Sequence, residues 1–140
     1  MSATILDGRK IAKQMSAEID DCVSSFKKTR DITPKIAIVR AGEDPGSVWY
    51  AKAIKKTMAS HGMDAELHVL DSTVTEKEMV SFAHKLNADE HIHGIMVQEP
   101  MPDGVNEAAV RLSVSPMKDV DGVHEVNAGR LLLADPTGRN

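Results

Sequence analysis

Three short apolar segments in this chain are each followed by an amphipathic helical pattern, and this alternation limits the fold more than any other feature. The apolar segments predict strands at 35–41, 65–70 and 93–98. The patterns that follow predict helices at 47–61, 75–86 and 105–112. Parallel neighbouring strands need a crossover, which is usually a right-handed helical connection. The sequence therefore predicts an α/β fold, a three-layer αβα domain with a mostly parallel sheet and helices on both faces.

Residues suited to helix ends support these boundaries. A further helix is predicted over 8–28, with Asp7 available as its N-cap. Ser47 can cap the second helix, and Gly62 can supply its left-handed stop. The run 75–78, Thr-Glu-Lys-Glu, has the spacing of a capping box, so a helix is expected to begin there.

Length, charge and hydropathy exclude several classes of protein. At 140 residues the chain is one ordinary domain, and its 41% hydrophobic and 27% charged residues are typical of a globular protein. A net charge of −4, without a basic stripe, argues against a nucleic-acid partner. No apolar stretch approaches the roughly 20 residues that span a bilayer, and no signal peptide is visible. We expect neither a membrane nor a nucleic acid as partner.

The single cysteine, Cys22, excludes an internal disulfide framework and favours a reducing cytoplasm. At helical spacing Cys22 shares one face with four apolar residues: Ile11, Met15, Ile19 and Phe26. This pattern predicts a core position for Cys22, not a nucleophile.

Common cofactor motifs are missing. The loop 42–46 is rich in glycine, but the chain has neither a G-K-[ST] phosphate loop nor a G-x-G-x-x-G fingerprint. His91 and His93 could share one face of a strand, although a zinc site would need more ligands at suitable spacing. The sequence predicts no metal site and no nucleotide-binding motif.

The end of the third predicted strand is the first candidate for a ligand site. The apolar run 94–97 stops at Gln98, and the prolines at 100 and 102 cannot continue a central ladder. Ligands of open parallel α/β sheets bind outside the carboxyl ends of the strands, which places Gln98 where a ligand-facing residue is expected. The alternative interpretation is a strand end followed by a stiff loop.

Tyr50 and Asp121 are further candidates. Tyr50 lies early in the helix after the first strand, where its ring could lie against a planar ligand; a half-buried surface tyrosine is an equal alternative. In 119–122, Asp-Val-Asp-Gly, one of the two carboxylates could face the same cleft as Gln98. Turn formation before Gly122 is the plain alternative.

Several motifs together resemble one family. They are 6–12, 45–50, 86–89, 94–102, 116–122 and 127–131, and they cover the chain in the right order and spacing. The sequence is similar to the methylenetetrahydrofolate dehydrogenase/methenyltetrahydrofolate cyclohydrolase family. The resemblance implies that residues 1–140 are the N-terminal folate-binding domain, without the C-terminal NADP-binding Rossmann domain. The polar tail 135–140 looks like a severed connection.

The resemblance also implies roles for individual residues. Tyr50 matches the tyrosine that stacks on the folate, and Asp121 matches the aspartate that hydrogen-bonds the pterin. Gln98 matches the glutamine beside the catalytic lysine, and Val97 and Glu99 flank it in the substrate-contacting loop. Tyr50, Gln98 and Asp121 are thus the expected catalytic residues. NADP or NAD is the expected cofactor, bound mainly by the missing domain, and the full-length protein is expected to be a homodimer.

The main departure from the family is Ile54, which stands where bifunctional members have a lysine. At 3.6 residues per turn, Lys55 is rotated by about 100° from position 54 and Lys52 by about 200°. Hydride transfer depends mainly on positioning, whereas hydrolysis needs proton transfer. We therefore expect a dehydrogenase whose cyclohydrolase step is weak or lost.

Two alternatives to this function stay open. In the first, Lys56 or Lys52 substitutes for the missing lysine, so that the enzyme is bifunctional. In the second, the chain is a folate-binding domain without catalysis. Residues 1–140 alone are expected to be inactive. Further departures near the site stand at Glu99, where leucine is usual, and at Val123 and Glu125.

Overall fold

The computed structural model describes residues 3 and 5–133, and within them a parallel sheet has the strand order β2-β1-β3. The strands are β1 (Lys35–Ala41), β2 (Asp64–Leu70) and β3 (Gly94–Val97). The helices are α1 (Gly8–Arg30), α2 (Pro45–Ser60), α3 (Glu76–Ala88), α4 (Glu107–Ser113) and α5 (Glu125–Leu132). The sequence analysis did not predict α5, and the polar tail 135–140 lies outside the described residues.

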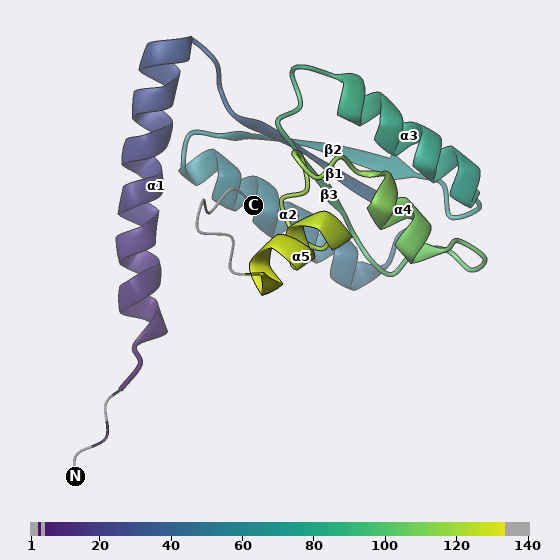
Figure 1. Ribbon diagram of the computed structural model, residues 1–140, viewed down its shortest axis with the longest axis horizontal. Coiled ribbons are helices and arrows are strands. Elements are labelled where there is room, and N and C mark those ends of the chain that lie inside the picture. Colours follow the sequence, from purple (N-terminus) through teal and green to yellow (C-terminus); the bar gives the residue numbers. More distant parts are fainter. Residues whose placement is uncertain (1–2, 4, 134–140) are drawn as a thin grey trace.

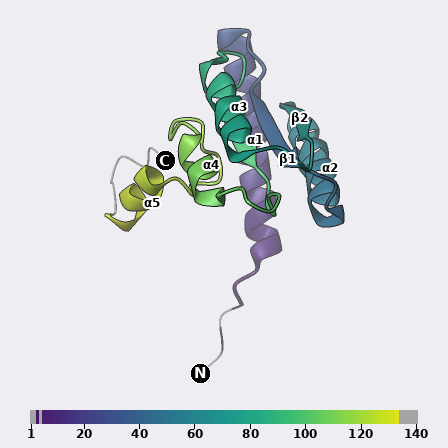
Figure 2. The same ribbon diagram turned by 90° about the vertical axis from the view of Figure 1, so that its right-hand side faces the viewer.

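The strand β1 is central and pairs in parallel with both neighbours. Its full length pairs with β2, from Lys35 opposite Asp64 to Ala41 opposite Leu70. The shorter β3 pairs with residues 36–39 of β1. In Figures 1 and 2, α2 covers one face of the sheet, and α3 and α4 lie on the other. The predicted α/β fold with a parallel sheet is confirmed.

The core forms between the sheet and α3. The side chains of Ala37 and Val39 on β1, Ile95 on β3, and Ala83 and Leu86 on α3 are buried in one apolar cluster. The predicted capping box at the start of α3 is present, because Glu78 N donates to Thr75 Oγ1 and Thr75 N donates to Glu78 Oε2. This cap fixes the residue at which α3 begins, and thereby which of its side chains face the sheet.

The N-cap predicted for α2 is wrong by three residues. Asp44 caps this helix, and its Oδ1 accepts a hydrogen bond of 2.8 Å from Ser47 N. Pro45 stands at the first helical position, where its fixed φ favours the helix and its missing N–H costs nothing. The helix therefore starts before Ser47. At its other end Gly62 has φ +71°, as the predicted left-handed stop requires.

The helix α1 lies at one end of the molecule (Figure 1) and corrects the prediction for Cys22. Cys22 is exposed, and Val23 is the buried residue of this helix. The four residues that share its face are also exposed: Ile11, Met15, Ile19 and Phe26. Asp7 caps α1 as predicted. The helical pattern was therefore correct, but the described residues do not cover its apolar face.

Polar contacts join α1 to the end of α2. The Nδ1 of His61 lies 2.7 Å from Asp20 Oδ1, and its Nε2 lies 3.3 Å from Ser16 Oγ. Lys27 Nζ donates to the carbonyl oxygen of Gly62 at 3.1 Å. No helix in the described part of the chain is long and apolar enough to cross a membrane.

A close approach beside Gly94 brings the segment 118–121 against β3. Ile95 N donates to Lys118 O at 2.6 Å, and Ile95 forms an isolated parallel bridge with Asp119. A Cβ atom on Gly94 would collide with Val120 and would lie 3.0 Å from a methyl carbon of Ile36. Glycine is therefore required for this segment to pass so close to the sheet.

Candidate functional site

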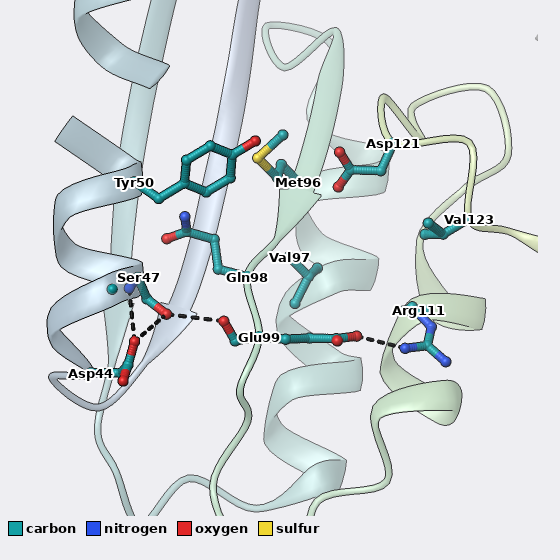
Figure 3. Close-up of a pocket in the computed structure, with 11 residues that line it drawn as sticks. Asp44, Ser47, Tyr50, Met96, Val97, Gln98, Glu99, Arg111, Asp121 and Val123 are labelled. Atoms are coloured by element: carbon teal, nitrogen blue, oxygen red, sulfur yellow. Dashed lines mark hydrogen bonds and ion pairs between the residues drawn. The ribbon is translucent and has the colours of Figure 1, made fainter. Parts of the chain in front are cut away.

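A cavity of about 660 Å³ opens at the carboxyl edge of the sheet (Figure 3). Its walls come from the start of α2, the end of β3, one residue of α4 and the loop before α5. The lining residues are Asp44, Gly46, Ser47, Tyr50, Met96, Val97, Gln98, Glu99, Arg111, Asp121 and Val123. The five predicted site residues are all in this set, so the fold brings them together. Their individual roles stay predictions.

Gln98 carries the clearest sign of a ligand site. Its side chain is 5% exposed, and neither Oε1 nor Nε2 has a hydrogen-bond partner among the described residues. Its backbone N donates to Val39 O at 2.8 Å, which holds the residue at the end of the sheet. A buried amide without partners costs on the order of 1–3 kcal/mol. A molecule that offers both a donor and an acceptor would recover this cost.

Tyr50 and Asp121 lie at one end of the cavity as Figure 3 draws it. Tyr50 is half exposed on α2, so one face of its ring is available for a planar molecule. Burial, and then the negative charge of Asp119, raise the pKa of Asp121 above its usual value. An ionised Asp121 is thus short of hydrogen-bond donors, which a ligand could supply.

The neighbouring Asp119 has the turn-forming role that the sequence left open. Its carboxylate accepts hydrogen bonds from His124 N at 2.9 Å, Asn127 Nδ2 at 2.9 Å and Val123 N at 3.4 Å. Burial alone would raise the pKa of Asp119, but these hydrogen bonds outweigh it and lower the pKa. Of the two carboxylates, Asp119 holds the loop and Asp121 lines the cavity.

The other end of the cavity is charged. Arg111 Nη1 lies 2.5 Å from Glu99 Oε1 in an ion pair between α4 and the loop after β3. Ser47 Oγ donates to Glu99 O at 3.0 Å, which ties the same loop to α2. Hydrogen bonds from the backbone N and then the hydroxyl of Ser47 hold the pKa of Asp44 below its usual value. These contacts fix the loop that carries Gln98 and Glu99.

Position 54 contributes no chemistry to this cavity. Ile54 is half buried on α2 and is not among the lining residues. Lys52, Lys55 and Lys56 are exposed, and none of them lines the cavity. Within the described part of the chain, the cavity lining has one cationic side chain, Arg111.

The sequence analysis missed Asp44, Met96 and Arg111 as lining residues. Asp44 lies in the loop 42–46, which was considered for its glycines alone. Met96 lies within the third predicted strand, of which only the last residue, Gln98, was considered a ligand-facing position. Arg111 belongs to the short helix α4, which contains no recognised motif. Whether its side chain reaches the cavity depends on how α4 packs. The described residues hold no group of three or more His, Cys, Asp or Glu side chains that could bind a metal ion.

Comparisons with known proteins agree on one family. The model of the tetrahydrofolate dehydrogenase/cyclohydrolase catalytic domain matches residues 6–121. The bifunctional protein FolD of Bacillus subtilis is 40% identical over 137 residues, which are 98% of this chain and 48% of that protein. The chain thus spans about half the length of the curated relatives it matches.

Two solved structures with a similar fold come from a silkworm and a trypanosome. A 5,10-methylenetetrahydrofolate dehydrogenase from the silkworm Bombyx mori has a TM-score of 0.87 and 34% identity, covering 94% of this chain and 46% of that one. The methylenetetrahydrofolate dehydrogenase-cyclohydrolase of Trypanosoma brucei, complexed with NADP and an inhibitor, has a TM-score of 0.84 and 27% identity. It covers 96% of this chain and 46% of that one.

Proposed function

The chain belongs to the tetrahydrofolate dehydrogenase/cyclohydrolase family, and from this premise we propose that its cavity binds a reduced folate. The unpartnered amide of Gln98 is the observation that carries the proposal. A pterin ring has N–H donors and a carbonyl acceptor along its edge, so it can satisfy both atoms of that amide. We infer that the whole protein oxidises methylenetetrahydrofolate to methenyltetrahydrofolate.

Each predicted site residue has a task in this proposal. The carboxylate of Asp121 accepts hydrogen bonds from the pterin, and the ring of Tyr50 stacks on the folate. Val97 and Glu99 contact the substrate on either side of Gln98. The described residues thus orient the folate, and orientation is the main contribution a protein makes to hydride transfer.

The hydride acceptor is a nicotinamide cofactor, NADP or NAD. The NADP in the Trypanosoma brucei relative supports this choice. Residues outside these 140 bind most of the cofactor, and residues 1–140 form the folate-binding domain. We therefore expect residues 1–140 alone to bind reduced folates weakly and to reduce no NADP. In full length, the protein is a homodimer of the cytoplasm.

We further propose that the cyclohydrolase step is weak or lost. Hydrolysis of the methenyl group needs an activated water and a proton carrier. Ile54 can neither activate water nor carry a proton, and the lysines at 52, 55 and 56 do not line the cavity. The bifunctional alternative with a substitute lysine would require α2 to shift.

The first test is Asp121→Asn in the full-length enzyme. Charge-assisted hydrogen bonds contribute on the order of 1.5–3 kcal/mol, so affinity for tetrahydrofolate should fall by roughly tenfold or more. In the parent, acidification should weaken binding as the pH falls through the raised pKa of Asp121, because the protonated form loses its charge. Calorimetry across pH measures both effects, with Asp103→Asn as control. Unchanged affinity would return Asp121 to a turn-forming role.

The second test is Ile54→Lys. Partial burial would lower the pKa of the new lysine toward the range useful for proton transfer. Cyclohydrolase activity should rise while the dehydrogenase changes little. Since Glu99 could hold the lysine protonated, the double variant with Glu99→Leu separates the two effects. If both variants stay folded and active as dehydrogenases but hydrolyse no faster than the parent, Ile54 does not explain the missing activity.

A further inference from the structure

The segment that carries Asp121 is anchored outside the cavity, at the C-terminal end of α3. Lys118 Nζ donates hydrogen bonds to the carbonyl oxygens of Leu86, at 3.0 Å, and of Asp89, at 2.7 Å. The last carbonyls of a helix have no partner within the helix, and a cation placed there also interacts favourably with the helix dipole. The end of α3 therefore holds the ammonium group of Lys118 in place.

The backbone between Lys118 and Asp121 is fixed along β3. Lys118 O accepts a hydrogen bond of 2.6 Å from Ile95 N, and Asp119 forms the parallel bridge with Ile95. Asp121 follows three positions after Lys118 and lines the cavity. Three residues span at most about 11 Å, so the anchor on α3 limits where the carboxylate of Asp121 can lie.

Lys118 has no direct access to a ligand in the cavity. Within the described part of the chain, Lys118 is not among the residues that line it. The raised pKa of Asp121 results from burial and then from the charge of Asp119, not from the charge of Lys118. An effect of Lys118 on ligand binding must therefore act through the position of Asp121.

We propose that Lys118 is a positioning residue, whose contacts with the end of α3 set the place of Asp121 and thereby the affinity for the pterin. The proposal rests on the proposed function, because it needs a folate in the cavity. In Figure 3 Asp121 faces Tyr50 and Gln98. A displaced carboxylate would therefore lose its contact with a ligand that the other two residues still hold.

The plainer explanation is that Lys118 only caps α3. In that case Lys118→Met lowers the stability of the domain, but the folded variant binds folate as tightly as the parent does. A double-mutant cycle separates the two explanations, because it measures whether the effect of one substitution on affinity depends on the presence of the other.

The cycle uses the full-length parent, Lys118→Met, Asp121→Ala and the double variant, and calorimetry measures the dissociation constant of tetrahydrofolate for each. Lys118→Met should weaken binding by roughly three- to tenfold where Asp121 is present, within the range of couplings between residues of one network. In the Asp121→Ala background the same substitution should change the affinity by less than about twofold. Urea titration verifies that each variant is folded.

Lys85→Met is the matched control, because Lys85 is an exposed residue in the last turn of the same helix. It should retain the parent affinity. If Lys118→Met does not fold, Lys118→Gln takes its place in the cycle, since its shorter, uncharged side chain weakens both contacts with the carbonyl oxygens.

The outcomes are distinguishable. If the parent does not bind tetrahydrofolate, the proposed function fails and this inference fails with it. If Lys118→Met leaves the affinity unchanged, or weakens it by the same factor with and without Asp121, folate binding stands and the role of Lys118 is wrong. If Asp121→Ala alone leaves the affinity unchanged, folate binding stands but Lys118 cannot act through Asp121, which also overturns the inference.

Discussion

The helices α3 and α1 have similar amphipathic sequences but opposite environments. The 13 residues of α3 bury Met79, Ala83 and Leu86 against the rest of the domain. The 23 residues of α1 bury Val23, and the remainder of its apolar face is exposed. Apolar residues hold α3, whereas α1 is joined to α2 through His61 and Gly62. A periodic pattern thus identifies the apolar face of a helix, but a neighbouring element decides whether that face is buried.

The largest expected difference between α3 and α1 is in the free energy of unfolding that is lost when one apolar side chain of each helix is truncated. Met79 is 2% exposed and Ile19 is 39% exposed. Met79→Ala should lower the free energy of unfolding by about 2–5 kcal/mol, because it removes buried methylene groups and leaves a cavity. Ile19→Ala should cost under about 1 kcal/mol. Urea titration of both variants measures the difference, and equal losses would mean that the face of α1 is covered in solution.

A smaller loss of stability is expected when a buried polar contact of α5 is removed. Asn127 is 1% exposed, and its Nδ2 donates to Pro116 O and Asp119 Oδ2, each at 2.9 Å. Asn127→Ala should cost about 1–3 kcal/mol, since it leaves buried acceptors without their donor. It should also weaken folate binding, because the loop that carries Asp121 loses an anchor. Loss of stability with full affinity would show that the loop holds its shape without Asn127.

The smallest effect is expected from the polar contacts of α1. Asp20→Asn removes the charge that faces His61, and exposed pairs of this kind contribute about 0–1 kcal/mol. Unfolding by urea should hardly change, while amide hydrogen exchange in α1 should become faster than in the parent. Exchange in α3 should stay the same. Faster exchange throughout the domain would mean that α1 supports the core more than its burial indicates.

The sequence predicted those parts of the fold that depend on local chemistry. The capping box of α3 and the Gly62 stop follow from residues a few positions apart, and both are confirmed. The start of α2 was wrong because Pro45 and Asp44 together are a stronger signal than Ser47. The burial of Cys22 was wrong because it depends on a partner for α1, which no local pattern specifies.

The residues of the candidate site also divide into those that the sequence predicts and those that depend on tertiary packing. The strand end identified Gln98, and the positions of Tyr50 and Asp121 made them candidates with open alternatives. The resemblance to a family then favoured a ligand role for both, and the fold brings all three residues into one cavity. Arg111 lies a dozen residues after Glu99, and no motif connects the two. Their contact depends on how α4 packs, which is a tertiary property. Spacing along the chain could not predict it.

The close approach at Gly94 has a consequence for how this protein can evolve. A methyl group of Val120 fills the space that a side chain at position 94 would need, and Asp121 is the next residue. A lineage that gains a side chain at position 94 must therefore accept a smaller residue at position 120, or displace the carboxylate of Asp121 from the cavity. We expect substitutions at positions 94 and 120 to occur together among descendants, so that a change in the packing volume beside β3 also changes which ligand the cavity binds.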